Sequence, residues 1–217
     1  MEGSDKPKAL PLRPQFSSGP CIKRPGWSID QIQKYLLIGR SHRAKEPNHQ
    51  LFRIIQLVKE LLQIPEDYLV GIVPASNTGA YEMLMWNLLG AKPIDVFAWE
   101  HFGRQWVENA TKYLNLKNIR IISSEYGRIP DLSVARMDGD ICFTWNGTTS
   151  GARVPNAEWV CENRNGLTLC DATSAIFAQN LDWTKLDATT FSWQKVMGGE
   201  ASHGIIVLSP RAIERLE

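Results

Sequence analysis

Ala188-Thr189-Thr190-Phe191-Ser192-Trp193-Gln194-Lys195-Val196-Met197-Gly198-Gly199 is the stretch of sequence that decides the fold. Its first part is rich in β-branched and aromatic residues, which is typical of a strand, and the paired glycines indicate a turn after it. Short apolar or β-branched runs of the same kind recur along the chain. They predict seven strands, over residues 69–73, 94–98, 119–122, 141–145, 167–170, 188–193 and 205–208.

Helical patterns lie between several of these strands. Apolar residues fall at helical spacing from residue 51 to residue 64, where Pro65 ends the pattern, and residues 80–89 and 104–114 are also helix-like. Near-continuous apolar strands that alternate with helices are typical of a parallel sheet covered on both faces. The sequence therefore predicts the α/β class, as a three-layer α/β/α sandwich around a mainly parallel seven-stranded sheet.

Composition narrows the range of functions. The chain has 217 residues, of which 43% are hydrophobic and 22% charged, enough to bury a core. The net charge of +1 is spread along the chain, so neither nucleic acid nor a membrane surface is an expected partner. No apolar stretch reaches membrane-spanning length and no targeting segment is recognised, which predicts a cytoplasmic protein. Several prolines in residues 1–30 predict an extended arm before a domain over residues 31–217.

Two residues at predicted strand ends suggest a site. Asp171 closes the run Leu167-Thr168-Leu169-Cys170-Asp171, and Lys195 follows the strand over residues 188–193. In a parallel sheet, ligands bind beyond the carboxyl ends of the strands, where both side chains would lie. An amine and a carboxylate placed in this way suit pyridoxal phosphate, with the lysine as Schiff base and the carboxylate on the ring nitrogen. Taken singly, Lys195 could equally be a solvated loop residue and Asp171 a helix cap.

Four further segments carry candidate binding groups, each with a structural alternative. The turn over residues 74–80 could hold a phosphate at a helix start, or could simply cap that helix. The hydroxyl-rich residues 145–151 could hold a ring oxygen or form an ordinary polar loop. Phe102 could stack on a planar cofactor or belong to the core, and Arg43 could bind a carboxylate or phosphate or be solvated. The histidines lack metal-ligand spacing, so we expect no metal site.

Six short segments, taken together and in this order, resemble the phosphoserine aminotransferase family, in the class V group of fold-type I pyridoxal phosphate enzymes. The resemblance runs from about Phe16 to the last residue, and the fold that it implies agrees with the predicted sheet. The segments are Phe16-Ser17-Ser18-Gly19-Pro20, Gly39-Arg40-Ser41-His42-Arg43, residues 75–80, residues 145–151, residues 170–175 and residues 191–200.

The resemblance implies roles for the residues that could bind the cofactor. Lys195 would form the Schiff base and then move a proton between substrate and cofactor, while Asp171 would keep the pyridine nitrogen protonated. Phe102 would stack on the ring and Thr148 would bond the ring oxygen. The phosphate would be held by Asn77, Thr78 and Gln194, and Ser76 would share that role if the register differs by one residue.

The substrate side is implied in the same way. Arg43, with His42 and Ser18, would bind the carboxylate or phosphate of the substrates. The implied reaction is amino transfer between L-glutamate and 3-phosphohydroxypyruvate, which gives O-phospho-L-serine and 2-oxoglutarate on the route to L-serine. The family's alternatives are another class V enzyme, such as an alanine–glyoxylate or serine–glyoxylate aminotransferase or a cysteine desulfurase.

Family members continue beyond the position where this chain stops, into a smaller carboxyl-terminal domain. The resemblance therefore implies a truncated member that lacks part of the substrate grip and some of the contacts made across the family's homodimer. We expect such a chain to bind pyridoxal phosphate weakly through Lys195 and to be poorly active. The alternative that is not an enzyme is a non-catalytic remnant of a truncated gene.

Overall fold

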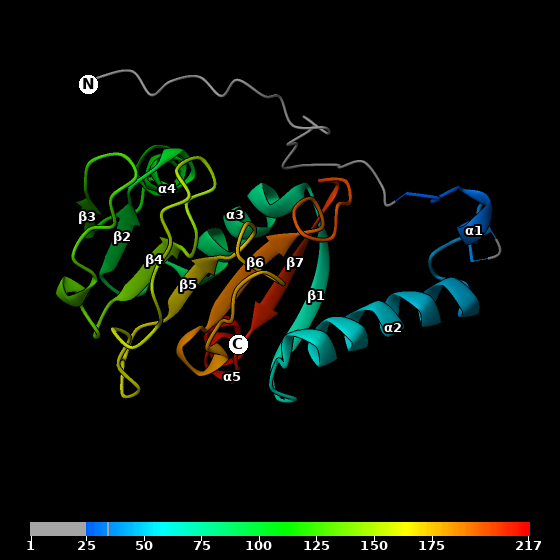
Figure 1. Cartoon of the computed structure of the whole chain (residues 1–217). Helices are drawn as coiled ribbons and strands as arrows, with labels where there is room; N and C mark the ends of the chain where they lie inside the picture. Colours follow the sequence, from blue (N-terminus) through cyan, green and yellow to red (C-terminus); the bar gives the residue numbers. More distant parts are fainter. Residues whose placement is uncertain (1–24, 34) are drawn as a thin grey trace, which may run out of the picture.

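A seven-stranded sheet forms the centre of the computed structural model, which describes residues 25–33 and 35–217 (Figure 1). The strand order is β1-β7-β6-β5-β4-β2-β3. Only β7 runs against its neighbours β1 and β6, and the other four pairings are parallel, so the predicted mainly parallel sheet is confirmed. The strands are β1 Leu69–Pro74, β2 Ile94–Ala98, β3 Ile119–Ser123, β4 Asp140–Thr144, β5 Thr168–Asp171, β6 Ala188–Ser192 and β7 His203–Leu208.

The helices lie between and around these strands. Their bounds are α1 Asp30–Gln33, α2 Lys45–Leu62, α3 Ser76–Leu88, α4 His101–Glu108 and α5 Pro210–Leu216. A π-helical turn, Asn109–Tyr113, continues α4, and two 3-10 turns occupy Leu132–Val134 and Trp183–Lys185. Within the described part of the chain, no helix is both long and apolar enough to span a bilayer.

Alternate residues of the central strands supply two separate cores. Val96 of β2 packs in the core under α3, α4 and α5, whereas its neighbour Phe97 belongs to the core on the opposite face. Every residue of β2, β4, β5 and β6 is buried. Burial on both faces explains why these strands are nearly continuous apolar runs rather than alternating ones.

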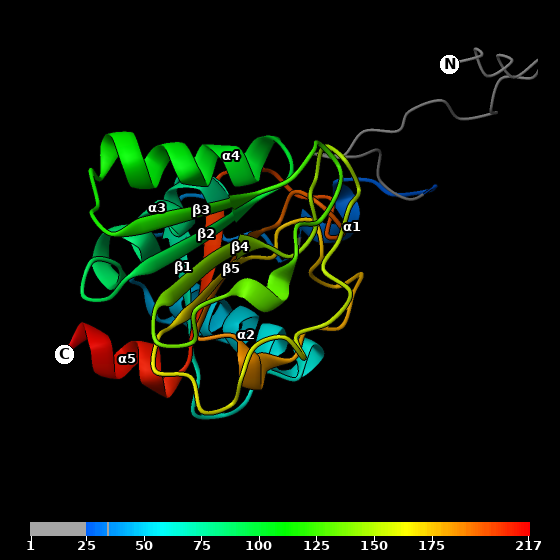
Figure 2. The same ribbon diagram turned by 90° about the vertical axis from the view of Figure 1, so that its left-hand side faces the viewer.

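The second face is covered in part by α2 and largely by irregular chain. Figure 2 shows α2 on the side of the sheet away from α3 and α4. Val58 is the buried residue of α2, and it packs with Trp183 and Phe191. The rest of the cover comes from segments without helices of their own, such as those that carry Val154 and Ala175. Because α2 contacts the sheet at β1, most of its apolar residues remain outside this core.

Helix α2 begins earlier than its apolar spacing predicts. The predicted helix starts at residue 51, but α2 starts at Lys45 and runs through Pro47. Proline is tolerated there because the N–H groups of the first turn have no partner within the helix. The end agrees better with the prediction: Gln63 adopts the left-handed conformation at φ 53, its N–H and that of Ile64 bond back to α2, and Pro65 follows.

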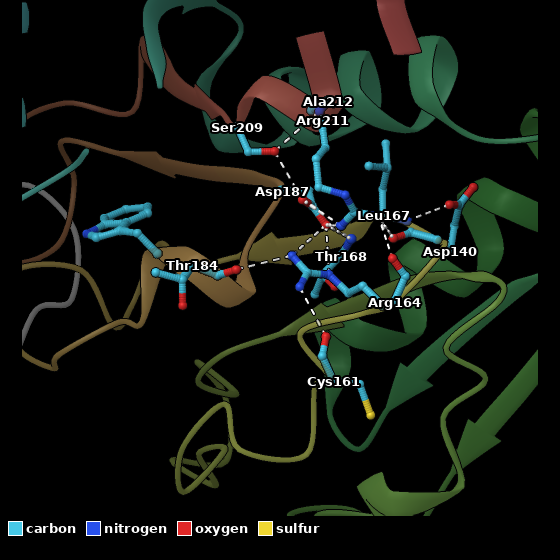
Figure 3. A network of polar contacts seen from close by, with 12 residues as sticks. Asp140, Cys161, Arg164, Leu167, Thr168, Thr184, Asp187, Ser209, Arg211 and Ala212 are labelled. Carbon is cyan, nitrogen blue, oxygen red and sulfur yellow. Dashed lines mark hydrogen bonds and ion pairs between the residues drawn. The ribbon is translucent and has the colours of Figure 1, made fainter. Parts of the chain in front are cut away.

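A buried ionic network fixes α5 to the amino ends of the central strands (Figure 3). Asp187 is 1% exposed and accepts hydrogen bonds from Arg164 Nε at 3.1 Å and from Arg211 Nη1 at 3.0 Å. The hydroxyl of Ser209 and the N–H of Thr168 also donate to this carboxylate. The four donors come from three segments, so the single carboxylate joins β5, the chain before β5, and the start of α5.

Replacing Asp187 by asparagine is expected to destabilise the fold by about 3 kcal/mol, because it leaves two arginines without their buried counter-charge. The measurement is urea unfolding followed by circular dichroism. Asp182→Asn is the matched control, since Asp182 is an exposed cap of the neighbouring 3-10 turn. A loss for Asp187→Asn no larger than that of the control would show that the network contributes little.

Candidate functional site

The carboxyl ends of β4, β5 and β6 bring polar residues to one face of the sheet. Asp171 is the last residue of β5, and its register partners are Thr144 of β4 and Thr190 of β6. Residues in register on neighbouring strands point to the same face, and two residues earlier on these strands Cys142, Leu169 and Ala188 all belong to the core under α3 and α4. Asp171 therefore projects toward α3 and α4.

Asp171 is a buried carboxylate, and each of its oxygens accepts a hydrogen bond. The indole Nε1 of Trp106 donates to Oδ2 at 3.1 Å, and the N–H of Thr173 donates to Oδ1 at 3.1 Å. Burial raises the pKa of Asp171; hydrogen bonds from Thr173, Trp106 and Asn77 oppose this, and the pKa remains above its ordinary value. The Thr173 bond shows that Asp171 does cap a local turn, but Oδ2 is engaged separately by α4.

Lys195 lies close enough to Asp171 for the two charges to interact. Desolvation lowers the pKa of the Lys195 amine, the charge of Asp171 opposes that shift, and the net pKa is lowered. The side chain is half-buried in the turn that follows β6. The structure therefore brings together the two residues that the sequence singles out, and it gives Lys195 a larger neutral fraction than a solvated lysine would have.

The turn around Lys195 depends on its glycines. Gly198 donates its N–H to the carbonyl of Lys195 at 2.8 Å and has φ +62. A Cβ on Gly199 would lie 2.8 Å from the Cβ of Trp193, and one on Gly204 would lie 2.4 Å from the carbonyl oxygen of Ser76. The Gly199 approach closes the lysine turn on itself, and the Gly204 approach brings the start of β7 against the first turn of α3.

The predicted phosphate turn is itself the first turn of α3, which begins at Ser76 rather than at residue 80. Ala75 and Ser76 both have positive φ, at 67 and 61, a conformation that costs energy for residues with a Cβ and that occurs often at functional sites. Asn77 is 7% exposed and contributes a hydrogen bond to Asp171. The side chain of Asn77 thus reaches Asp171, and Ser76 and Thr78 lie on either side of it in the same turn.

Glu100 joins the segments that carry Phe102 and Thr148. Its Oε1 accepts the N–H of Gly103 at 2.7 Å, and its Oε2 accepts the hydroxyl of Thr149 at 2.9 Å. Glu100 is fully buried at the start of α4, and a Cβ on Gly147 would lie 2.5 Å from its Cγ. Phe102 is half-buried in the first turn of α4, so this carboxylate fixes the turn of Phe102 and the loop of Thr148 together.

The proposed substrate residues do not converge on Asp171 within one copy of the chain. His42 and Arg43 lie in an exposed turn at the start of α2, the end of that helix farther from β5 and β6 in Figure 1. The N–H of Arg43 bonds to the Ser41 hydroxyl at 3.2 Å. Ser18 lies outside the described residues.

Several buried polar atoms near Asp171 could receive a polar ligand. Among the described residues, no hydrogen-bond partner is found for Asn77 Oδ1 or for the hydroxyls of Thr144, Thr173, Thr190 and Ser192. Buried polar groups are normally paired, so a group of unpaired ones beside a buried carboxylate and a half-buried lysine fits a ligand with several polar atoms. Within the described ranges, no cluster of histidine, cysteine and acidic residues is arranged to hold a metal.

Trp106 and Glu100 were not predicted from the sequence. Glu100 has a local signal, because a carboxylate three residues before Gly103 at a strand end is typical of a helix cap. Trp106 has no such signal, since it meets Asp171 across 65 residues of sequence.

Comparison with known proteins supports the resemblance seen in the sequence. No protein-family model matches the chain. It is 53% identical over 212 residues to "Phosphoserine aminotransferase" of Methanosarcina barkeri, a match that covers 98% of this chain and 57% of that protein. The chain thus spans little more than half the length of this curated relative.

Solved structures share the fold. A phosphoserine aminotransferase from Cytophaga hutchinsonii superposes with a TM-score of 0.77 at 26% identity, over 86% of this chain and 52% of that one. An alanine–glyoxylate aminotransferase from Nostoc sp. gives a TM-score of 0.79 at 22% identity, over 97% of this chain and 57% of the other. The fold alone does not separate these enzymes, but the sequence does: the chain is 53% identical to the phosphoserine aminotransferase of Methanosarcina barkeri and 22% identical to the alanine–glyoxylate aminotransferase of Nostoc sp..

Proposed function

We propose that the domain over residues 31–217 binds pyridoxal phosphate through Lys195, as the cofactor-binding part of a phosphoserine aminotransferase. The proposed reaction moves an amino group between L-glutamate and 3-phosphohydroxypyruvate, giving O-phospho-L-serine and 2-oxoglutarate in L-serine biosynthesis. The observation that carries the proposal is the pair formed at the sheet edge by the buried Asp171 carboxylate and the half-buried Lys195 amine, in which the pKa of Asp171 is raised and that of Lys195 is lowered.

Pyridoxal phosphate, when bound, supplies a carbonyl that captures amines and a ring that accepts electrons from the substrate. Asp171 would sit at the ring nitrogen. Its raised pKa makes it a better proton acceptor than a solvated carboxylate, so it favours a shared proton at that nitrogen. Lys195, with its lowered pKa, offers a neutral amine that can bond to the carbonyl and later carry a proton.

The remaining residues would orient the cofactor. We assign Phe102 to the face of the ring, and Thr148 to the ring oxygen. Ser76 and Thr78, at the amino end of α3, and Gln194 would hold the phosphate, because free N–H groups and the helix dipole favour an anion there. Asn77 would share this role through its backbone N–H in the first turn of α3, since its side chain donates to Asp171.

We further propose a homodimer in which the start of α2 from one copy completes the site of the other. Arg43 and His42 come just before α2, whose start lies away from β5 in its own copy (Figure 1). The same helix leaves Phe52, Ile54 and Leu61 exposed at 56%, 38% and 68%, an apolar surface that a second copy would cover. Substrates carrying carboxylate and phosphate groups would then meet the arginine fork across the interface.

Mixing two defective variants tests this arrangement. Arg43→Ala and Lys195→Ala each remove one part of a site, but a mixed dimer would restore one complete site from the two copies. Random pairing on coexpression is expected to recover about a quarter of the response of the unmodified protein to O-phospho-L-serine. No recovery above that of the separate variants would show that Arg43 does not act across a dimer.

A substrate panel tests the proposed reaction itself. The chain is loaded with pyridoxal phosphate, and the change in visible absorption is followed on adding O-phospho-L-serine or L-alanine. We expect O-phospho-L-serine to convert the bound cofactor and L-alanine to do so far more slowly. The reverse preference would favour an enzyme of the alanine–glyoxylate type. A folded chain that shows no band with the cofactor would indicate a non-catalytic remnant.

We also place the protein in the cytoplasm.

A further inference from the structure

Trp106 is positioned by three segments and has one polar contact. The side chain is 1% exposed on α4, and its Nε1 donates to Asp171 Oδ2 at 3.1 Å. Tyr81 of α3 packs on the indole, with ring centroids 4.5 Å apart and planes inclined by 40°. The Tyr81 hydroxyl donates to the carbonyl of Leu169 at 3.2 Å, two residues before Asp171 on β5. The orientation of the indole is therefore fixed from the helix side and from the strand that carries the carboxylate.

An indole N–H is a suitable hydrogen-bond donor to a carboxylate that must also share a proton with a ring nitrogen. Indole donates one hydrogen bond, accepts none and does not ionise in the range of protein chemistry. It can therefore hold Oδ2 without competing for the proton that a ring nitrogen would share with Asp171. With Thr173 holding Oδ1 and Asn77 also bonding to the carboxylate, these donors fix its plane and leave a lone pair for the ring nitrogen.

We propose that Trp106 is a positioning residue for Asp171, which sets the orientation of this carboxylate and its affinity for a proton at the cofactor's ring nitrogen. This inference rests on the proposed function, because it assumes that Asp171 meets that nitrogen. Trp106 would act only through Asp171.

The titratable groups around Asp171 do not obscure its own ionisation in the acidic range. Lys195 is the cation that acts on Asp171 from the turn after β6. Tyr81 and Cys170 also face this region, but burial raises the pKa of each well above its ordinary value, so both stay neutral in mild acid. A ¹³C titration of the Asp171 carboxyl in the acidic range therefore follows Asp171 without interference from Tyr81 or Cys170.

The test uses the whole chain without cofactor, labelled with ¹⁵N in tryptophan and ¹³C in the aspartate carboxyl groups. The Trp106 indole and Asp171 carboxyl resonances are assigned by their loss in Trp106→Phe and Asp171→Asn. We expect the Trp106 indole N–H resonance to move with the ionisation of Asp171 and to stop moving in Asp171→Asn. This comparison uses Trp106→Phe only for the assignment, which correlation spectra from the backbone to the indole also provide if that variant folds poorly.

Trp106→Phe should raise the pKa of Asp171 by about one unit, because it removes a hydrogen bond to the charged form. The affinity for pyridoxal phosphate should fall about tenfold, because the carboxylate loses the donor that fixes its orientation toward the ring nitrogen. Trp99→Phe is the matched control: Trp99 is equally buried at 1%, but its Nε1 donates to the carbonyl of Ala152. The control should leave the Asp171 pKa and the affinity unchanged.

An indole resonance of Trp106 that ignores the ionisation of Asp171 would overturn the inference, as would an unchanged Asp171 pKa in Trp106→Phe. If the unmodified chain forms no visible band with pyridoxal phosphate, the cofactor assignment fails instead. The carboxyl titration reports on Trp106 independently of that band, so the two failures are distinguishable.

Discussion

Replacing Lys195 by alanine is expected to abolish the visible absorption band that pyridoxal phosphate acquires on binding to this chain. Bonding to the cofactor's carbonyl requires a neutral amine, and desolvation lowers the pKa of Lys195 so that this form is more abundant. The position is also constrained, because Gly198 and Gly199 fold the following turn back onto Lys195 and Trp193. Absorption spectroscopy with added pyridoxal phosphate measures the effect directly.

Lys112→Ala is the control for this substitution. Lys112 lies just after α4 with 67% of its side chain exposed, in an ion pair with Glu108 that is unrelated to the sheet edge. This variant should retain the band. A band of unchanged position and intensity in Lys195→Ala would remove Lys195 from its proposed role.

Asp171→Asn is expected to slow the conversion of the bound cofactor by O-phospho-L-serine by about a hundredfold, the size of effect usual for a preorganised charge in an active site. Asparagine keeps the shape of the side chain but cannot share a proton with the ring nitrogen. Attachment of the cofactor to Lys195 should survive, so the loss appears in the rate of conversion. Stopped-flow absorption separates these two readouts.

The same variant has an expected effect on stability, with a sign set by the raised pKa of Asp171. A carboxyl with a folded pKa above its unfolded value of 3.8 contributes stability that is present below 3.8 and is lost as the pH rises through the folded pKa. Asp171→Asn removes this dependence, so the variant should be at least as stable as the unmodified chain at neutral pH. Urea unfolding at acidic and neutral pH, with the exposed Asp131→Asn as control, tests the sign. A variant that reacts at the normal rate and is less stable at neutral pH would contradict the assignment of Asp171.

The fold was largely predictable because its central strands are short, buried on both faces and separated by clear turn signals. The strand β2 has the predicted bounds for this reason. The reversed direction of β7 left no trace in its apolar pattern, since burial and not direction determines that pattern. The start of α3 was missed because Ser76-Asn77-Thr78-Gly79 reads as a polar turn. The positive φ angles of Ala75 and Ser76 show that the chain enters the helix through a strained turn at that point.

The residues of the candidate site also differ in whether the sequence could predict them. Asp171 and Lys195 were predictable because the carboxyl ends of adjacent parallel strands meet at one edge of a sheet. Trp106 and Glu100 contact their partners 65 and 49 residues away in sequence, and only the packing of α4 against the sheet brings them there. The sequence predicts that Arg43 binds a carboxylate or phosphate, but the position of Arg43 relative to Asp171 depends on how α2 projects from β1.

The proposal that Lys195 bonds to pyridoxal phosphate can be tested directly by borohydride reduction of the chain in the presence of the cofactor, followed by peptide mapping. The reduction makes the bond between cofactor and amine permanent, and the mapping identifies the lysine that carries it. We expect a single predominant adduct on Lys195, formed at a lower pyridoxal phosphate concentration than an adduct on any other lysine. Adducts spread over exposed lysines such as Lys112 and Lys117, with none favoured at Lys195, would contradict it.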